Sequence, residues 1–191
     1  MDFIRKQIEE SLKVKTLLLD DENIQKSIKT AATFCCEALR NDKKIIFAGN
    51  GGSAADAQHL AGELVNRFGF DRPGLSAIAL TTDTSVITSI ANDYGFEKLF
   101  SRQIQAIGKK GDVLVVLSTS GNSSNIIEGI KEARKTGIIT IGLTGRSGGK
   151  MPPLCDICLN VPSDDTPRIQ EAHILIGHIL CSIIENSLFR R

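Results

Sequence analysis

The sequence predicts an α/β protein, a three-layer α/β/α sandwich with a five-stranded parallel sheet and an N-terminal helical extension. Two observations predict this fold. Five short apolar runs of strand length alternate with helical patterns after residue 43, and the residues before them are helical throughout. Strands separated by helices form right-handed crossovers, which give a parallel sheet covered on both faces. A length of 191 residues suits one domain.

The elements follow in order along the chain. Residues 1–40 are expected to form helices, because Ile4, Ile8 and Leu12 recur every four residues. The α/β core is expected over residues 43–191. Its strands are the runs KIIFA, SAIAL, DVLVVLS, GIITIGL and DICLNV, and its helices include Ser53–Phe68, Asn122–Lys135 and Thr166–Phe189. Ligands bind beyond the carboxyl ends of such strands, which directs attention to the loops after KIIFA and DVLVVL.

Charge and composition exclude several classes of protein. The 23 basic and 22 acidic residues nearly balance, and no Lys/Arg-rich block marks a nucleic-acid binder. The charged N-terminus does not resemble a signal peptide, and no uninterrupted apolar run approaches the ~20 residues that span a bilayer. Five cysteines without secretory context indicate reduced thiols in a cytoplasmic protein. Cys155 and Cys158 form a CxxC in an expected strand, where they would point to opposite faces as small apolar side chains.

The loop GNGGS after the first strand predicts close approach of a ligand to the backbone. Gly49, Gly51 and Ala54 formally satisfy the GxGxxA pattern of dinucleotide-binding dehydrogenases. The acidic residue that such enzymes place at the end of the second strand is missing, because Asp71 lies in the turn FDRPG before that strand. No GxxxxGK[ST] pattern is present either. The dehydrogenase reading is therefore the weakest.

The loop STSGNSSN after the third strand run is rich in hydroxyl groups. Ser118, Thr119, Ser120 and Ser123 surround Gly121 and lead into a helix, where hydroxyls, free N–H groups and the helix dipole suit a phosphate monoester. An ordinary helix cap would also use Ser and Asn. Four hydroxyls in six residues exceed what a cap requires, so a small phosphorylated molecule is the preferred ligand.

His59 and Glu63 lie four residues apart on the helix after GNGGS, and so on one face. Such a pair is commonly only a surface contact. The other histidines, His173 and His178, lie in a C-terminal helix that is apolar nearly all round, so its polar residues need partners. Gln170 and His178 are about 80° apart around that helix, and Gln170 and His173 about 60°. Spacing does not choose between the two histidines.

The motifs GNGGSAADAQH, STSGNS, ANDYG and DTPRIQEAHILIGH together resemble the sugar isomerase (SIS) domain family, and within it the phosphoheptose isomerases, over essentially the whole chain. The resemblance implies a zinc ion, one per subunit, held by His59, Glu63, Gln170 and His178, a set of nitrogen and oxygen donors that zinc accepts. His173 is then expected to be a hydrogen-bonded helix residue.

The resemblance also implies a reaction. It is the aldose–ketose isomerisation of D-sedoheptulose 7-phosphate to D-glycero-D-manno-heptose 7-phosphate through an enediol(ate), the first step of nucleotide-activated heptose biosynthesis, with Glu63 and His178 as acid and base. Arg67, one helical turn beyond Glu63, would add a charge near the substrate. The substrate residues implied are Asn50, Gly51, Gly52, Glu63, Asn92, Asp93, Ser118, Thr119, Ser120, Ser123 and Gln170.

The family's assembly is a homotetramer, in which the helices of residues 1–40 would pack on neighbouring subunits. Two alternatives stay open. Some SIS proteins of this length bind a bacterial replication initiator without catalysis, and one such relative lacks the equivalents of Glu63 and His178. Another phosphosugar isomerase or a sugar-phosphate sensor is the second alternative.

Overall fold

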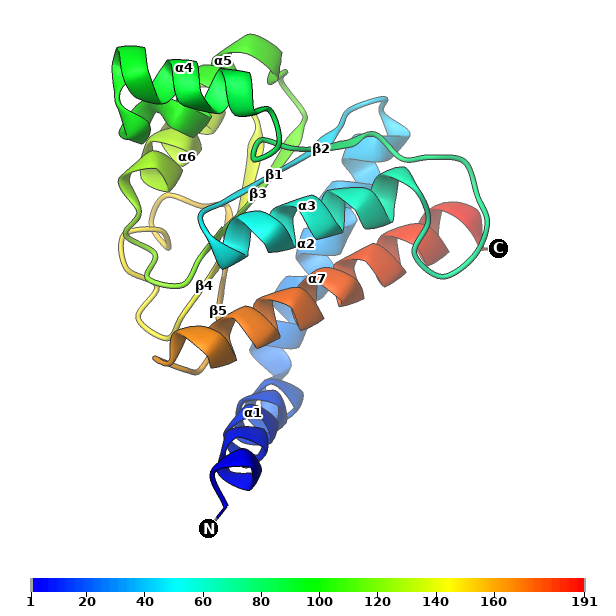
Figure 1. Cartoon of the computed structure of the whole chain (residues 1–191). Coiled ribbons are helices and arrows are strands. Elements are labelled where there is room, and N and C mark those ends of the chain that lie inside the picture. The colour runs from blue at the N-terminus through cyan, green and yellow to red at the C-terminus, as the bar shows by residue number, and fades with distance from the viewer. Residues whose placement is uncertain (1, 191) are drawn as a thin grey trace.

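A computed structural model describes residues 2–190 and confirms the α/β fold with five parallel strands (Figure 1); Met1 and Arg191, at the ends of the two expected segments, lie outside the described residues. The strands are β1 (Ile45–Gly49), β2 (Ala77–Ala79), β3 (Val113–Ser118), β4 (Ile139–Thr144) and β5 (Ile157–Asn160), in the order β2-β1-β3-β4-β5. Every residue of β1 and β3 is buried, which explains their unbroken apolar sequence. Gly49 pairs with Leu117, so the loops after β1 and β3 start side by side.

Helices cover both faces of the sheet (Figure 1). The described helices are α1 (Phe3–Asp20), α2 (Glu22–Arg40), α3 (Gly52–Val65), α4 (Thr84–Tyr94), α5 (Leu99–Ile107), α6 (Ser124–Thr136) and α7 (Thr166–Phe189), with a short 3-10 helix, η1 (Phe96–Lys98), before α5. Helices α2, α3 and α7 share one apolar core with the sheet, and α5 and α6 share another on the opposite face. The three-layer prediction is confirmed.

The boundary expected near residue 43 needs a correction. Helix α2 is part of the core, because Ile24, Ile28 and Ala31 are buried in the cluster shared with β1, β3 and α7. Asp21 begins α2 by accepting hydrogen bonds from the backbone N–H groups of Asn23 and Ile24. Of the first 40 residues, α1 alone projects from the body of the molecule (Figure 1).

Helix α3 ends at Val65, three residues earlier than expected. The cause is Arg72, whose buried guanidinium donates hydrogen bonds to the carbonyls of Glu63, Leu64 and Asn66 and so takes the acceptors that a further turn would use. Because the helix stops there, Arg67 is an exposed residue beyond its end, and the expectation that Arg67 lies one helical turn past Glu63 is wrong.

The expectation that Cys155 and Cys158 point to opposite faces is also wrong, although both do pack as small apolar side chains against the core. Strand β5 begins at Ile157, so Cys155 lies in the bend before it, and the alternation of a strand does not relate the two residues. A Cβ added to Gly142 would lie 3.0 Å from Cys155 Sγ and 3.4 Å from Cys158 Sγ. Both side chains therefore lie on the same face of the sheet.

Helix α7 is long and apolar enough to cross a membrane by length and composition, although the sequence analysis found no uninterrupted run of that kind. In the fold this helix packs against α1, α2 and α3, and Ile169, Ile176 and Leu180 are buried in the core they share. A core helix passes the same test, so this one helix is weak evidence for a membrane.

Candidate active site

The loop after β1 brings backbone to the mouth of the sheet at the point where the strand order reverses, between β1 and β3. Gly51 has φ +56° as the residue before α3, a conformation that disfavours a side chain. Gly52 begins the helix beneath Gln170, and a Cβ on Gly52 would lie 2.6 Å from Gln170 Nε2. The glycines therefore leave room for the backbone turn and for the Gln170 amide.

The two loops are joined by a pair of amides that the sequence analysis missed. Asn50 Nδ2 donates to Asn125 Oδ1 over 2.9 Å, and Asn125 Nδ2 donates to Asn50 Oδ1 over 2.8 Å. Asn125 is buried in the first turn of α6 and its Oδ1 also accepts from the N–H of Ile126. The side chain of Asn50 is thus fixed in place by the second loop, and Asn125 is a positioning residue.

The serine at the N-cap position of α6 does not cap that helix with its side chain. Ser123 is the residue before α6, yet its side chain makes no capping hydrogen bond and lies 3.3 Å from the Ser118 hydroxyl. Ser120 Oγ accepts from the N–H of Asn122 in the turn at Gly121. Thr119 and Ser120 line a cavity of about 280 Å³ between this loop, the loop after β4 and the start of α7. This arrangement disfavours the simple cap and leaves donors for an anion.

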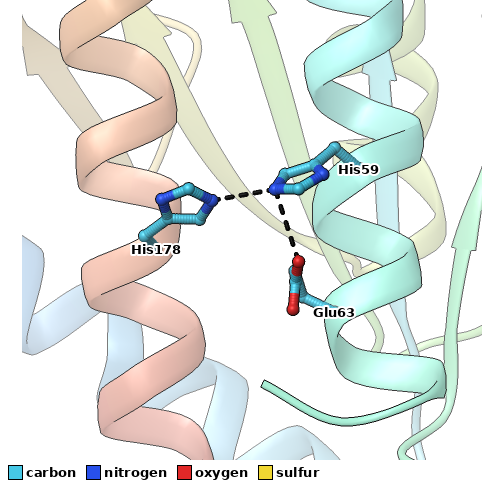
Figure 2. A group of neighbouring side chains, drawn as sticks. All are labelled: His59, Glu63 and His178. Atoms are coloured by element: carbon cyan, nitrogen blue, oxygen red, sulfur yellow. Dashed lines mark hydrogen bonds and ion pairs between the residues drawn. The ribbon is translucent and has the colours of Figure 1, made fainter. Parts of the chain in front are cut away.

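Three titratable side chains from α3 and α7 converge on one point. His59 Nε2 lies 2.8 Å from His178 Nε2 and 3.4 Å from Glu63 Oε1, as Figure 2 shows. Ligand atoms of all three residues lie within 4.8 Å of one another, and the group is partly exposed. The structure therefore places His178, the histidine that the family resemblance indicated, beside His59.

The surroundings of this group are partly apolar and partly acidic. The Phe68 ring lies 5.6 Å from the His178 ring, centroid to centroid. Asp56, one turn before His59 on α3, has a buried Oδ2 with no hydrogen-bond partner among the described residues. Burial raises the pKa of Asp56, and His59 and His178 oppose that rise. Asp56 is thus an acidic group that interacts electrostatically with both imidazoles.

The donor set fits a zinc ion. Two imidazole nitrogens and one carboxylate oxygen that face a common point are the ligands of a catalytic zinc, which keeps a further position open. Gln170, the expected fourth ligand, lies against Gly52, which is seven residues or about 10 Å along α3 from His59. Its role as a ligand stays a prediction.

A buried ion pair fixes α3 relative to α7 below this group. Arg72 Nε lies 3.0 Å from Glu185 Oε1, and both side chains are 1% exposed. Glu185 also accepts from the N–H groups of Phe68 and Gly69, while Arg72 binds the Glu63 carbonyl over 2.9 Å. The end of the helix that bears Glu63 is therefore tied to the helix that bears His178.

His173 lies apart from the site. It is fully buried, and neither ring nitrogen has a hydrogen-bond partner in the described part of the chain, so the expectation of a hydrogen-bonded residue is not met. Burial lowers the pKa of His173 to about 4, and the Thr144 backbone that faces the ring opposes this only in part. The ring is neutral at physiological pH.

Asn92 and Asp93 do not reach the two loops within one chain. Both lie exposed in the last turn of α4, where Asn92 Nδ2 donates to Asp93 Oδ1 over 2.7 Å. Asp93 lines a different cavity, bounded by β2, α4 and α5. Their contact with the sugar stays a prediction.

Comparison with known proteins gives a consistent result. The model of the SIS domain family matches residues 13–145. The chain is 57% identical over 189 residues to the phosphoheptose isomerase of Aneurinibacillus thermoaerophilus, covering 99% of this chain and 96% of that protein. It is also 57% identical to phosphoheptose isomerase 2 of Campylobacter jejuni, covering 98% and 93%.

Solved structures agree. The phosphoheptose isomerase of Neisseria gonorrhoeae superposes with a TM-score of 0.90 at 46% identity, covering 96% of this chain and 97% of that one. The enzyme of Francisella tularensis superposes with a TM-score of 0.92 at 40% identity, covering 96% of both chains. The similarity thus extends over nearly the full length in sequence and in fold.

Proposed function

The chain belongs to the SIS domain family, and we propose that its two loops and the His59, Glu63 and His178 group form the active site of a phosphoheptose isomerase. The enzyme is a phosphosugar isomerase that converts D-sedoheptulose 7-phosphate to D-glycero-D-manno-heptose 7-phosphate in heptose biosynthesis. The observation that carries the site assignment is the convergence of the three side chains from α3, the helix that begins at the GNGGS loop, and α7.

The chemistry needs a proton to move between neighbouring carbons of the sugar. We assign this transfer to Glu63 and His178, which approach the same point from two helices. The carboxylate and the imidazole are the usual groups for removing and returning such a proton. Hydroxyls of Ser118, Thr119, Ser120 and Ser123 would hold the phosphate at the other end of the substrate, at the start of α6.

Zinc is proposed as the cofactor, one ion per subunit. His59, Glu63 and His178 would hold it, with the Gln170 amide as the expected fourth ligand. When bound, the ion would polarise the sugar oxygens and stabilise the enediolate. Removal of metal by a chelator should lower activity, and zinc should restore it more fully than magnesium because imidazole ligands favour zinc. Full activity of protein that contains no metal by elemental analysis would refute the zinc assignment.

The direct test of function is incubation of the pure protein with sedoheptulose 7-phosphate, with formation of the aldose followed by NMR. Glu63→Gln and His178→Gln should each lower the rate by about 10²–10⁴-fold, because each removes one proton carrier. His173→Gln is the matched control and should retain far more activity, since His173 lies apart from the group. Near-normal turnover by Glu63→Gln or His178→Gln would remove that residue from the mechanism.

A non-catalytic role finds no support. The alternative, a SIS protein that binds a replication initiator, predicts that the catalytic positions are dispensable, whereas here both Glu63 and His178 are present and in one group. The relatives named above are phosphoheptose isomerases. The place of action is proposed to be the cytoplasm, where activated heptose for lipopolysaccharide or capsule would be made.

A homotetramer is the proposed assembly, built through α1. Six large apolar side chains on this helix are exposed in the single chain: Phe3, Ile4, Ile8, Leu12, Leu17 and Leu19. An apolar groove of about 690 Å³ lies nearby, lined by residues of α1, α2 and α7. Exposed apolar patches of this kind commonly mark interfaces.

The assembly can be tested by light scattering and activity together. Deletion of residues 1–19 should reduce both, and Ile8→Asp should weaken assembly because it places a charge on the apolar face. Arg5→Ala is the control, since among the described residues Arg5 forms its ion pair with Glu9, on the same helix. A fully active monomer of the parent protein would refute the proposal.

A further inference from the structure

Two thiols lie together outside the proposed active site. Cys155 and Cys158 pack against the α5–α6 face of the sheet, opposite the face that carries α3 and α7. Both sulfur atoms approach the same point above Gly142 of β4, at 3.0 Å and 3.4 Å from the position a Cβ would take there. The absence of a side chain on Gly142 is what lets the two sulfurs lie side by side.

The pair is accessible, unlike the other thiols. Cys155 and Cys158 are partly exposed, whereas Cys35, Cys36 and Cys181 are at most 4% exposed. Cys155 lies in the bend before β5, and β5 is an edge strand that pairs only with β4. Closure of a disulfide would therefore move this bend and the edge strand rather than an interior strand of the sheet.

The two thiols also differ in reactivity. The contact between the two thiols lowers the pKa of Cys158 and raises the pKa of Cys155, which burial raises further. Burial raises the pKa of Cys181 to about 12. Because the thiolate is the nucleophile in exchange reactions, Cys158 is suited to attack and Cys155 to resolve.

We propose that Cys155 and Cys158 form a redox-modification site, which closes to an intramolecular disulfide by exchange with a small-molecule disulfide such as oxidised glutathione. The Cys158 thiolate attacks one sulfur of that disulfide, and the first glutathione leaves as a thiolate that takes up a proton. The Cys155 thiol then loses its proton and attacks Cys158 Sγ, which releases the second glutathione as a thiol. Two protein thiols are oxidised, and one disulfide is reduced to two thiols.

The test is a thiol count under denaturing conditions after equilibration of the folded protein with oxidised glutathione. The reduced chain has five thiols. We expect three to remain, with no glutathione attached, and we expect mass spectrometry to show a peptide that joins Cys155 to Cys158. Retention of all five thiols, or stable attachment of glutathione to both residues of the parent protein, would overturn the proposal.

Single variants separate the two roles. Cys155→Ser should keep one glutathione on Cys158, because the resolving thiol is gone, and Cys158→Ser should react much more slowly. Cys35→Ala is the matched control: it removes a buried thiol and should still lose two thiols to the disulfide. Equal rates of glutathione attachment in Cys155→Ser and Cys158→Ser would refute the assignment of Cys158 as the attacking thiol.

Discussion

Removal of Glu185 should destabilise the protein and loosen its active site at the same time. In Glu185→Ala, three donors lose their acceptor: the buried Nε of Arg72 and the part-buried N–H groups of Phe68 and Gly69. Loss of one partner of a buried ion pair costs about 3–5 kcal/mol, because the other charge stays buried without compensation. We therefore expect the free energy of unfolding to fall by about 4 kcal/mol.

The same variant should lower the rate of isomerisation. Arg72 also binds the carbonyls of Glu63 and Leu64, so an unpaired Arg72 would no longer hold the end of α3 against α7. Displacement of a catalytic group by about 1 Å can cost up to about 10²-fold in rate. Denaturant unfolding followed by circular dichroism measures the first effect, and the turnover of the still-folded variant measures the second.

A control variant and the dependence on pH test whether the effect comes from the Glu185 carboxylate. Lys26→Ala breaks an exposed pair with Glu22 and should cost less than about 1 kcal/mol. Burial raises the pKa of Glu185, but the N–H groups of Phe68 and Gly69 and the Arg72 charge lower it by more, so the pKa lies below the ordinary carboxyl value. Its contribution is therefore present above the ordinary carboxyl pKa and is lost as the pH falls through the folded-state value. The difference between parent and Glu185→Ala should narrow in acid. An unchanged unfolding midpoint for Glu185→Ala at neutral pH would refute the reasoning.

Three further predictions concern the core and the loops. Above pH 6.5 His173 is neutral in the folded and the unfolded protein, but between pH 6.5 and its folded pKa of about 4 only the unfolded chain takes up the proton. The free energy of unfolding of the parent should therefore fall by about 3 kcal/mol over this range. In His173→Leu the free energy of unfolding should depend less steeply on pH in acid, and an equal dependence would refute this. Gly51→Ala, at φ +56°, should lower the free energy of unfolding by about 1–3 kcal/mol and remove most activity. Gly62→Ala should be tolerated, because a Cβ at Gly62 would meet no atom within 4 Å. Ser120→Ala should weaken binding of the phosphorylated sugar by about 1.5–3 kcal/mol in calorimetry and leave binding of unphosphorylated sedoheptulose unchanged; equal effects on both would refute a phosphate contact.

The fold was largely predictable because its signals are local. The strands of Ile45–Gly49 and Val113–Ser118 are buried on both faces, so their sequence is an unbroken apolar run that periodicity detects. Helix α7 was predicted to its end residues, since Pro167 marks its start and the apolar pattern continues to Phe189. The early end of α3 could not be predicted, because its cause is Arg72, a residue outside the helix.

The features of the site that are local in sequence could likewise be predicted, and those that depend on tertiary contacts could not. The loops and the His59–Glu63 pair follow from spacing within one segment, but the choice of His178 over His173 depends on how α7 lies against α3, and only the family resemblance supplied it. The Asn50–Asn125 amide pair joins residues 75 positions apart, and nothing in either local sequence announces it. The faces of Cys155 and Cys158 were misjudged because the expected strand included Cys155, whereas β5 begins two residues later, at Ile157, and strand alternation does not extend to Cys155.

Helix α7 comes long after α3 in the chain, and this order has a consequence for how the enzyme is made. His59 and Glu63 leave the ribosome more than a hundred residues before His178 does. Until α7 has been synthesised and docked, the nascent chain has neither the third side chain of the group nor Glu185 to neutralise Arg72. A chain truncated before α7 would therefore be inactive and would leave an uncompensated cation and an apolar layer open to other proteins, a form that cellular proteases can recognise.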